Sequence, residues 1–186
     1  MLEKCCMAIL KIVTYPDPVL KAVAAPVEEI THDIKQLVDD MFDTMYLADG
    51  VGLAAPQVGE SVRIIVVDVN VHGKFDDTTT QGPIGPKEHG SQKFGMINPV
   101  ILSREGEIEW EEGCLSIPDF RLKMKRANLI TVEYQDTDGN KKSLSCEGLL
   151  AVAIQHEIDH LDGKILIDNV SRLKRDLYLK RMSKLK

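Results

Sequence analysis

The sequence lacks long apolar runs, and only 5% of its residues are aromatic. No apolar stretch approaches the roughly 18 residues that a membrane-spanning helix needs. Residues 1–6 place an acidic and a basic side chain among apolar ones, unlike a secretory signal. With 44% hydrophobic and 28% charged residues among 186, a wholly disordered chain is excluded and one domain with a substantial core is expected. We expect a cytoplasmic protein with no membrane partner.

Cysteine is also scarce, with four residues in the chain. Cys5 and Cys6 are adjacent, whereas Cys114 and Cys146 are isolated. A chain of this length can build its own core without disulfides, so we expect free thiols in a reducing compartment. One or more of these thiols is then available as a metal ligand or a nucleophile.

Positive charge is scarce except at the C-terminal end. The chain has 23 basic and 29 acidic side chains, and its net charge of −6 argues against a surface that binds DNA throughout. Residues 172–186 hold seven basic and one acidic side chain, a charge of +6, and the remainder carries −12. On charge alone, this basic tail is either a solvated helix face or a docking surface.

Apolar periodicity and turn residues predict an α+β fold, with mostly antiparallel sheets packed around a buried helix and with a C-terminal helix. We expect one domain over residues 7–170, with a glycine-rich loop insertion at 72–95, followed by a basic helix over 171–186. The expected elements are an extended segment or strand at 8–14, a turn at 15–18, a helix from 31–33 to about 49–50, strands at 62–69, 96–103, 107–111, 129–135, 142–146 and 165–167, and helices at 148–161 and 171–185.

The strongest chemical signal is the pattern His156-Glu157-x-x-His160 in the helix expected at 148–161. Residues four apart project from one face of a helix, so both imidazoles can bind the same metal ion. Glu157 is placed to act as a general base. The flanking residues are apolar, and buried polar groups are costly unless they are paired or ligated. An exposed helix that carries two histidines by chance is therefore the weaker interpretation.

A catalytic metal ion usually takes a third protein ligand, and no histidine follows His160. Three residues after Gly163, where the extended zinc-protease pattern places a histidine, the chain has Leu166. Cys114 is the better candidate, because a thiolate is a strong ligand and Gly113 lets another backbone approach closely. A cysteine that is only a small buried residue is the alternative interpretation. Acidic alternatives near the end of the helix are Asp159, Asp162 and Asp168.

A third feature is the segment of small residues from Gly50 to Gln57. Small side chains allow a second backbone to pass nearby, and the Gln57 amide is able to polarise a carbonyl or bind an oxyanion. By itself, this segment is more typical of an ordinary glycine-rich turn, and it lacks the spacing of either phosphate-binding fingerprint.

In this order, the three segments resemble the peptide deformylase family. The family pattern is Gly-x-Gly-Leu-Ala-Ala-x-Gln, then Glu-Gly-Cys-Leu-Ser, then Gln-His-Glu-x-Asp-His-Leu. Residues 50–57, 112–116 and 155–161 match it at every defined position. Tyr15 to Leu20 is also similar, so the resemblance covers about residues 7–186. Residues 1–6 precede the usual start of the family, and we expect them to be disordered.

The resemblance implies a hydrolase that removes the formyl group from the N-terminal formylmethionine of newly made polypeptides. By position, Cys114, His156 and His160 would hold one divalent metal ion, expected to be Fe²⁺ in the cell, with Zn²⁺, Ni²⁺ or Co²⁺ as substitutes. The expected partners are nascent formylmethionyl peptides and, through residues 172–186, the ribosome.

The resemblance also implies catalytic and substrate-binding residues. Glu157 would take a proton from the attacking water and deliver it to the leaving amine. Gln57 and the backbone N–H of Leu115 would stabilise the oxyanion. Gly52 would bind the substrate backbone. The methionine side chain would occupy an apolar pocket lined by Val51, Leu149, Val152 and Ala153.

Two other function classes remain open. An ordinary metallopeptidase shares the helix motif, but the absent downstream ligand and the Cys114 segment disfavour it. A structural metal domain would leave Glu157 and Gln57 without a task, and structural zinc sites usually have four protein ligands.

Overall fold

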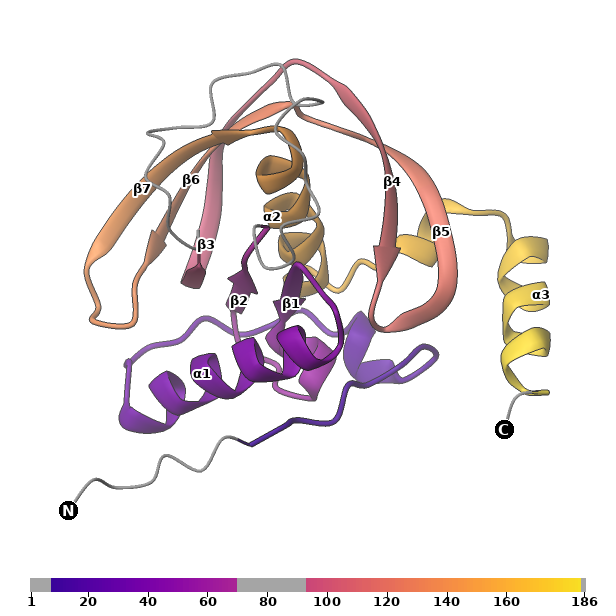
Figure 1. The fold of residues 1–186 in the computed structure, drawn as a ribbon, viewed down its shortest axis with the longest axis horizontal. Helices are drawn as coiled ribbons and strands as arrows, with labels where there is room; N and C mark the ends of the chain where they lie inside the picture. Colours follow the sequence, from indigo (N-terminus) through magenta and orange to yellow (C-terminus); the bar gives the residue numbers. More distant parts are fainter. Residues whose placement is uncertain (1–7, 70–92, 185–186) are drawn as a thin grey trace.

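The computed structural model describes residues 8–69 and 93–184 (Figure 1). The expectations for residues 1–6, and those for the loop at 72–95 as far as residue 92, lie outside the described residues. The loop was predicted to extend to residue 95, but Phe94 and Gly95 already belong to a strand. Cys114 and Cys146 are free thiols, as predicted, whereas Cys5 and Cys6 lie outside the described residues.

The described residues confirm the α+β class. Their helices are α1 (His32–Leu47), α2 (Gly148–Leu161) and α3 (Arg172–Met182), with short 3₁₀ turns η1 (Pro18–Lys21), η2 (Ala55–Val58) and η3 (Leu166–Asn169). Their strands are β1 (Gly52–Ala54), β2 (Ile64–Val67), β3 (Phe94–Glu105), β4 (Ile108–Cys114), β5 (Ile117–Arg126), β6 (Leu129–Gln135) and β7 (Lys141–Glu147). None of these helices is long and apolar enough to cross a bilayer.

Two antiparallel sheets surround α2. Among the described strands, the larger sheet has the order β1-β2-β3-β6-β7, and β4 pairs only with β5 in a separate two-stranded sheet. Figure 1 shows α2 between the curved large sheet and the β4–β5 hairpin, with α1 crossing below β1 and β2. The site therefore lies where two sheets that share no hydrogen-bonded ladder meet one helix.

β2 is a continuous apolar run because both of its faces are covered. Successive strand residues point to opposite faces, so Ile65 and Val67 pack in the core beneath α2 while Ile64 and Val66 pack against α1. All four side chains are fully buried. This strand fixes the position of β1, which pairs with it through Gly52↔Val67 and Ala54↔Ile65.

The buried helix α2 begins and ends at the predicted residues. Its side chains are buried around almost the whole circumference, which explains why its apolar residues do not form a single stripe. Gly163 follows its end with a φ of +70°. A Cβ at this position would lie 2.6 Å from the Lys21 carbonyl oxygen, so the chain needs glycine here.

Four local predictions were wrong or incomplete. The strand expected at 165–167 is instead part of η3, where the Asp168 carboxylate accepts a hydrogen bond from the Ile165 N–H at 3.0 Å. No strand was predicted in the segment from Gly50 to Gln57, but it contains β1. β5 was not predicted, although apolar and basic residues alternate through it. The C-terminal helix ends at Met182 rather than at 185.

Candidate metal and catalytic site

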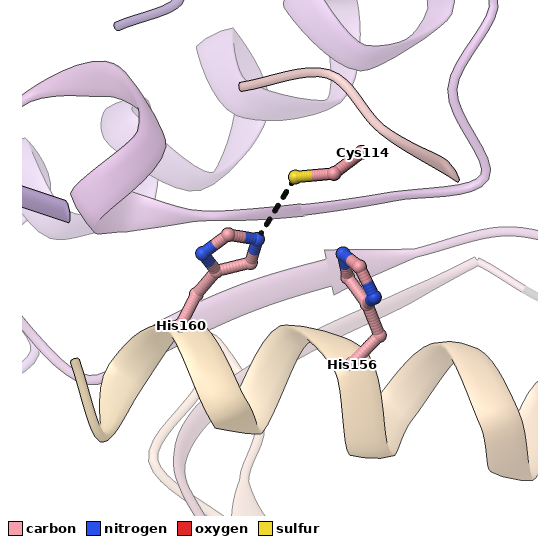
Figure 2. A group of neighbouring side chains, drawn as sticks. All are labelled: Cys114, His156 and His160. Carbon is pink, nitrogen blue, oxygen red and sulfur yellow. Dashed lines mark hydrogen bonds between the residues drawn. The ribbon is translucent and has the colours of Figure 1, made fainter. Parts of the chain in front are cut away.

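Cys114, His156 and His160 converge between β4 and α2. Cys114 is the last residue of β4, immediately before the turn into β5, and both histidines project from the same face of α2 (Figure 2). The Cys114 Sγ lies 3.2 Å from the His160 Nε2, and one donor atom from each of the three residues lies within 4.8 Å of the others. The imidazole rings lie 5.1 Å apart, centroid to centroid.

This donor set fits a divalent metal ion. A thiol and two imidazoles are ligands that Zn²⁺, Fe²⁺ and related ions share, and three protein ligands leave a position open for water or substrate. Both histidines are buried and Cys114 is half-buried. The His160 Nδ1 and the Glu157 Oε2 are buried with no hydrogen-bond partner among the described residues. The site therefore contains polar atoms that the protein's own hydrogen bonds do not satisfy.

The acidic alternatives are not part of this group. Each forms an ion pair with a basic side chain: Asp159 with Arg126, Asp162 with Arg63, and Asp168 with Lys21. Cys114 is therefore the third candidate ligand that the fold brings to the two histidines.

A buried ion cluster supports the candidate ligands. Arg126, the last residue of β5, donates from Nε and Nη2 to both carboxylate oxygens of Glu112, at 2.6 and 2.9 Å. Its Nη1 donates to Asp159 on α2 at 2.5 Å. Glu112 in turn lies 2.7 Å from the Nδ1 of His156. One arginine thus joins β5, β4 and α2 next to the candidate ligands.

The same cluster sets the protonation of His156. Burial alone would raise the pKa of Glu112, but hydrogen bonds from Arg126 and His156 outweigh burial and hold this pKa below its ordinary value. An ionised carboxylate only accepts hydrogen bonds, so the His156 Nδ1 carries the proton. Burial alone would lower the pKa of His156, but hydrogen bonds with Cys114 and Glu112 outweigh burial and raise it, so a metal ion would bind the His156 Nε2 in place of a proton.

Glu157 is buried against the backbone of β1. A Cβ at Gly52 would overlap its carboxylate and lie only 3.0 Å from its Cγ and Cδ. Glycine at this position therefore lets the Glu157 side chain adopt its observed place. Burial raises the pKa of Glu157 to about 7, which suits a group that both accepts and releases a proton near neutral pH.

The Gln57 amide is held with its N–H₂ group toward Cys114. Its Oε1 accepts a hydrogen bond from the Ala54 N–H at 2.7 Å, so the end of β1 fixes the orientation of the amide group. Its Nε2 donates to the Ser116 Oγ at 3.3 Å and lies 3.5 Å from the Cys114 Sγ. A buried amide donor thus lies beside the candidate metal ligands.

One groove opens over these side chains. Cys114, His156 and Glu157 line it, whereas the nearly inaccessible His160 does not. The other residues that the sequence assigned to the site also line this groove: Val51, Gly52, Gln57, Leu115, Leu149, Val152 and Ala153.

Comparison with known proteins identifies the family. The sequence profile of the polypeptide deformylase family matches residues 9–176. The chain belongs to the polypeptide deformylase family. The resemblance inferred from three motifs is therefore confirmed over nearly the whole chain.

Individual deformylases are similar in both sequence and structure. The peptide deformylase of Acidobacterium capsulatum is 48% identical, over 96% of each chain, and that of Thermodesulfovibrio yellowstonii is 47% identical, over 94% of this chain and 97% of its own. A Legionella pneumophila deformylase structure is 41% identical with a TM-score of 0.80, covering 96% of this chain and 95% of its own. An Ehrlichia chaffeensis deformylase in complex with actinonin is 35% identical with a TM-score of 0.84, over 97% and 99%.

Sequence reasoning missed the role of Arg126 in this deformylase site. Glu112 and Asp159 occupy defined positions of the family motifs, but Glu112 was assigned no task and Asp159 was considered only as an alternative metal ligand. The sequence signal for Arg126 was weak. Apolar and basic residues alternate from Phe120 to Lys125, which predicts a strand, and Arg126 then occupies a position on the apolar face of that strand.

We predict that Gly52→Ala lowers deformylation about 100-fold, because the new methyl group displaces the Glu157 carboxylate and small displacements of reacting groups have effects of this size. Metal content and the far-ultraviolet circular dichroism spectrum serve as controls and should match those of the wild type. Wild-type turnover in a folded, metal-loaded Gly52→Ala variant would contradict this role of Gly52.

Proposed function

We propose that the protein removes the formyl group from the N-terminal formylmethionine of newly made polypeptides and releases formate. As a member of the deformylase family, it is a metal-dependent hydrolase. The observation that carries the proposal is the convergence of a thiol, two imidazoles, a buried carboxylate and a buried amide, of which all but the His160 imidazole line one groove. Neither alternative class accounts for all five groups.

Cys114, His156 and His160 would hold one divalent ion, and we propose Fe²⁺ in the cell, with Zn²⁺, Ni²⁺ or Co²⁺ as substitutes. When bound, the ion supplies Lewis acidity toward the formyl carbonyl and toward water. The ligand set supports this proposal because thiolate and imidazole suit all four ions, whose selection then depends on geometry and supply.

The chain's own groups would carry the proton and stabilise negative charge. Glu157 takes a proton from the attacking water and passes it to the amine as the bond between the formyl carbon and the nitrogen breaks. The pKa of about 7 supports both steps, because the carboxylate and the carboxylic acid are then both accessible near neutral pH. The Gln57 Nε2 and the Leu115 N–H would donate hydrogen bonds to the oxyanion formed during attack.

The substrate would lie along the groove with its methionine side chain on an apolar surface. Gly52 would offer its backbone to the substrate, because it lines the groove on β1, an edge strand of the large sheet. The proposed methionine pocket is apolar and lines the same groove as Cys114 and His156. Its members are Val51, Leu149, Val152 and Ala153.

Two substitutions separate proton transfer from metal binding. Glu157→Gln should retain metal but lower formate release from formyl-Met-Ala by about 10²–10⁴-fold, since the amide cannot take the proton. Cys114→Ser should lose most of the metal, because it replaces the thiolate. Metal content by mass spectrometry and formate release by a coupled assay measure the two effects.

Acetyl-Met-Ala and unblocked Met-Ala are the matched control substrates. Cleavage between methionine and alanine without formate release would identify a metallopeptidase and overturn the proposal. Full activity of Glu157→Gln would refute its role as the base, and unchanged metal content in Cys114→Ser would refute its role as a ligand.

We further propose that residues 7–170 form the catalytic domain and that the helix from 171 onward contacts the ribosome, so that the protein acts in the cytoplasm on emerging chains. α3 supports this proposal because Arg172, Lys174 and Lys180 are exposed and its only acidic residue is Asp176. A basic helix of this kind complements the phosphate backbone of RNA.

Reversing the charge at Lys174 and Lys180 together, each to Glu, should weaken binding to purified ribosomes and reduce its dependence on salt concentration. Both side chains are exposed, so turnover of formyl-Met-Ala should not change. Replacing Lys141 and Lys142 together, each with Glu, on the β6–β7 hairpin is the control for net charge (Figure 1). Equal ribosome binding by the double variant and the wild type would reject the proposal.

A further inference from the structure

The first residues of β5 form one wall of the groove. Ile117, Pro118, Asp119 and Phe120 follow the turn after Cys114, and all four line the groove. Asp119 has a φ of +56°, a left-handed conformation that residues other than glycine adopt at an energetic cost. Surrounding contacts must therefore hold this wall in its observed shape.

Tyr178 of α3 supplies two such contacts. Its hydroxyl donates a hydrogen bond to the carbonyl oxygen of Pro118 at 3.2 Å. Its ring meets the ring of Phe120 edge to face, with the centroids 5.7 Å apart and the planes at 76°. The same ring lies 6.4 Å from that of Tyr15. The wall is thus attached to α3 through both its backbone and a side chain.

The rest of α3 is attached more lightly. Tyr178 is the buried residue of this helix, whereas Leu173 and Leu177 are 69% and 57% exposed. Arg181 reaches Asp119 at 3.5 Å, but both side chains are 61% exposed, and exposed ion pairs contribute little. Figure 1 shows α3 at the edge of the molecule, beside β5. Tyr178 is therefore the main link between this helix and the groove.

The wall shares no residue with the proposed methionine pocket. That pocket is built from α2 and from Val51, next to β1, whereas the wall belongs to β5. The wall is accordingly available to the substrate residues that follow methionine.

We infer that Tyr178 is a positioning residue, which holds the wall over 117–120 against the part of the peptide that follows formylmethionine. This inference rests on the proposed function. It makes α3 part of the structure that selects longer peptides, in addition to any docking role of its exposed basic face. Loss of Tyr178 should weaken binding of a long substrate more than binding of a short one.

The test compares Tyr178→Ala, Tyr178→Phe and the control Leu177→Ala, which changes an exposed neighbour on the same helix. The kcat and KM values are measured for formyl-Met-Ala and for a formylated tetrapeptide that begins Met-Ala. Tyr178→Ala should raise the tetrapeptide KM roughly 3- to 10-fold, the scale of one hydrogen bond and one ring contact, with a smaller effect on the dipeptide. Tyr178→Phe should give a smaller rise, and kcat and metal content should not change.

Unchanged KM values in folded Tyr178→Ala, or equal changes for the two peptides, would overturn the inference. If circular dichroism shows Tyr178→Ala to be unfolded, Tyr178→Phe decides, because it keeps the ring and removes only the donor to Pro118. In that case an unchanged tetrapeptide KM overturns the inference and a raised one supports it. A wild-type protein that releases no formate from either peptide would instead overturn the proposed function.

Discussion

A single buried guanidinium group joins the parts from which the site is built. Arg126 pairs with Glu112 on β4 and with Asp159 on α2, and its side chain is only 10% exposed. Among the described strands, the β4–β5 sheet shares no ladder with the large sheet, so side-chain contacts help to set its position relative to α2. Removing one partner of a buried ion pair leaves a charge unpaired, which typically costs about 3–5 kcal/mol. The separation of Cys114 from the two histidines therefore depends on this cluster.

The cluster also connects geometry with chemistry. Glu112 accepts hydrogen bonds from both Arg126 and His156, so the contact that positions β4 also fixes the proton on the His156 Nδ1. A metal ion held by Cys114 and the histidines would form a second link between β4 and α2. Because such an ion binds the folded chain, metal binding and the free energy of unfolding should be coupled.

Features that depend on residues close together in the sequence, such as helix α2 and the spacing of its histidines, could be predicted from the sequence. Helix α2 was predicted from Gly148 to Leu161 because its apolar residues and flanking glycines are local signals, and the spacing of its histidines follows from helix geometry. The three-residue apolar run at 165–167 fits either a strand or a turn, and the Asp168 side chain decides in favour of η3. β1 was missed because pairing with β2, rather than its own composition, makes it a strand.

Contacts between distant residues could not be predicted in this way. Arg126 is 14 residues from Glu112 and 33 from Asp159, and Tyr178 is 60 residues from Pro118. No periodicity relates such pairs, so only the folded chain shows that β5 supports the candidate ligands at one end and meets α3 at the other. The family motifs gave the candidate ligands, and the fold adds the residues that hold them in place.

The most direct test of this account is the affinity of the folded protein for Co²⁺ when Arg126 is replaced. Arg126→Met keeps much of the side-chain volume but removes both ion pairs, and Lys125→Met changes an exposed neighbour on the same strand. The account predicts that Arg126→Met weakens Co²⁺ binding about 10- to 100-fold, as loss of groups that orient metal ligands does, while Lys125→Met binds like the wild type. Wild-type Co²⁺ affinity in folded Arg126→Met would contradict the claim that this arginine assembles the site.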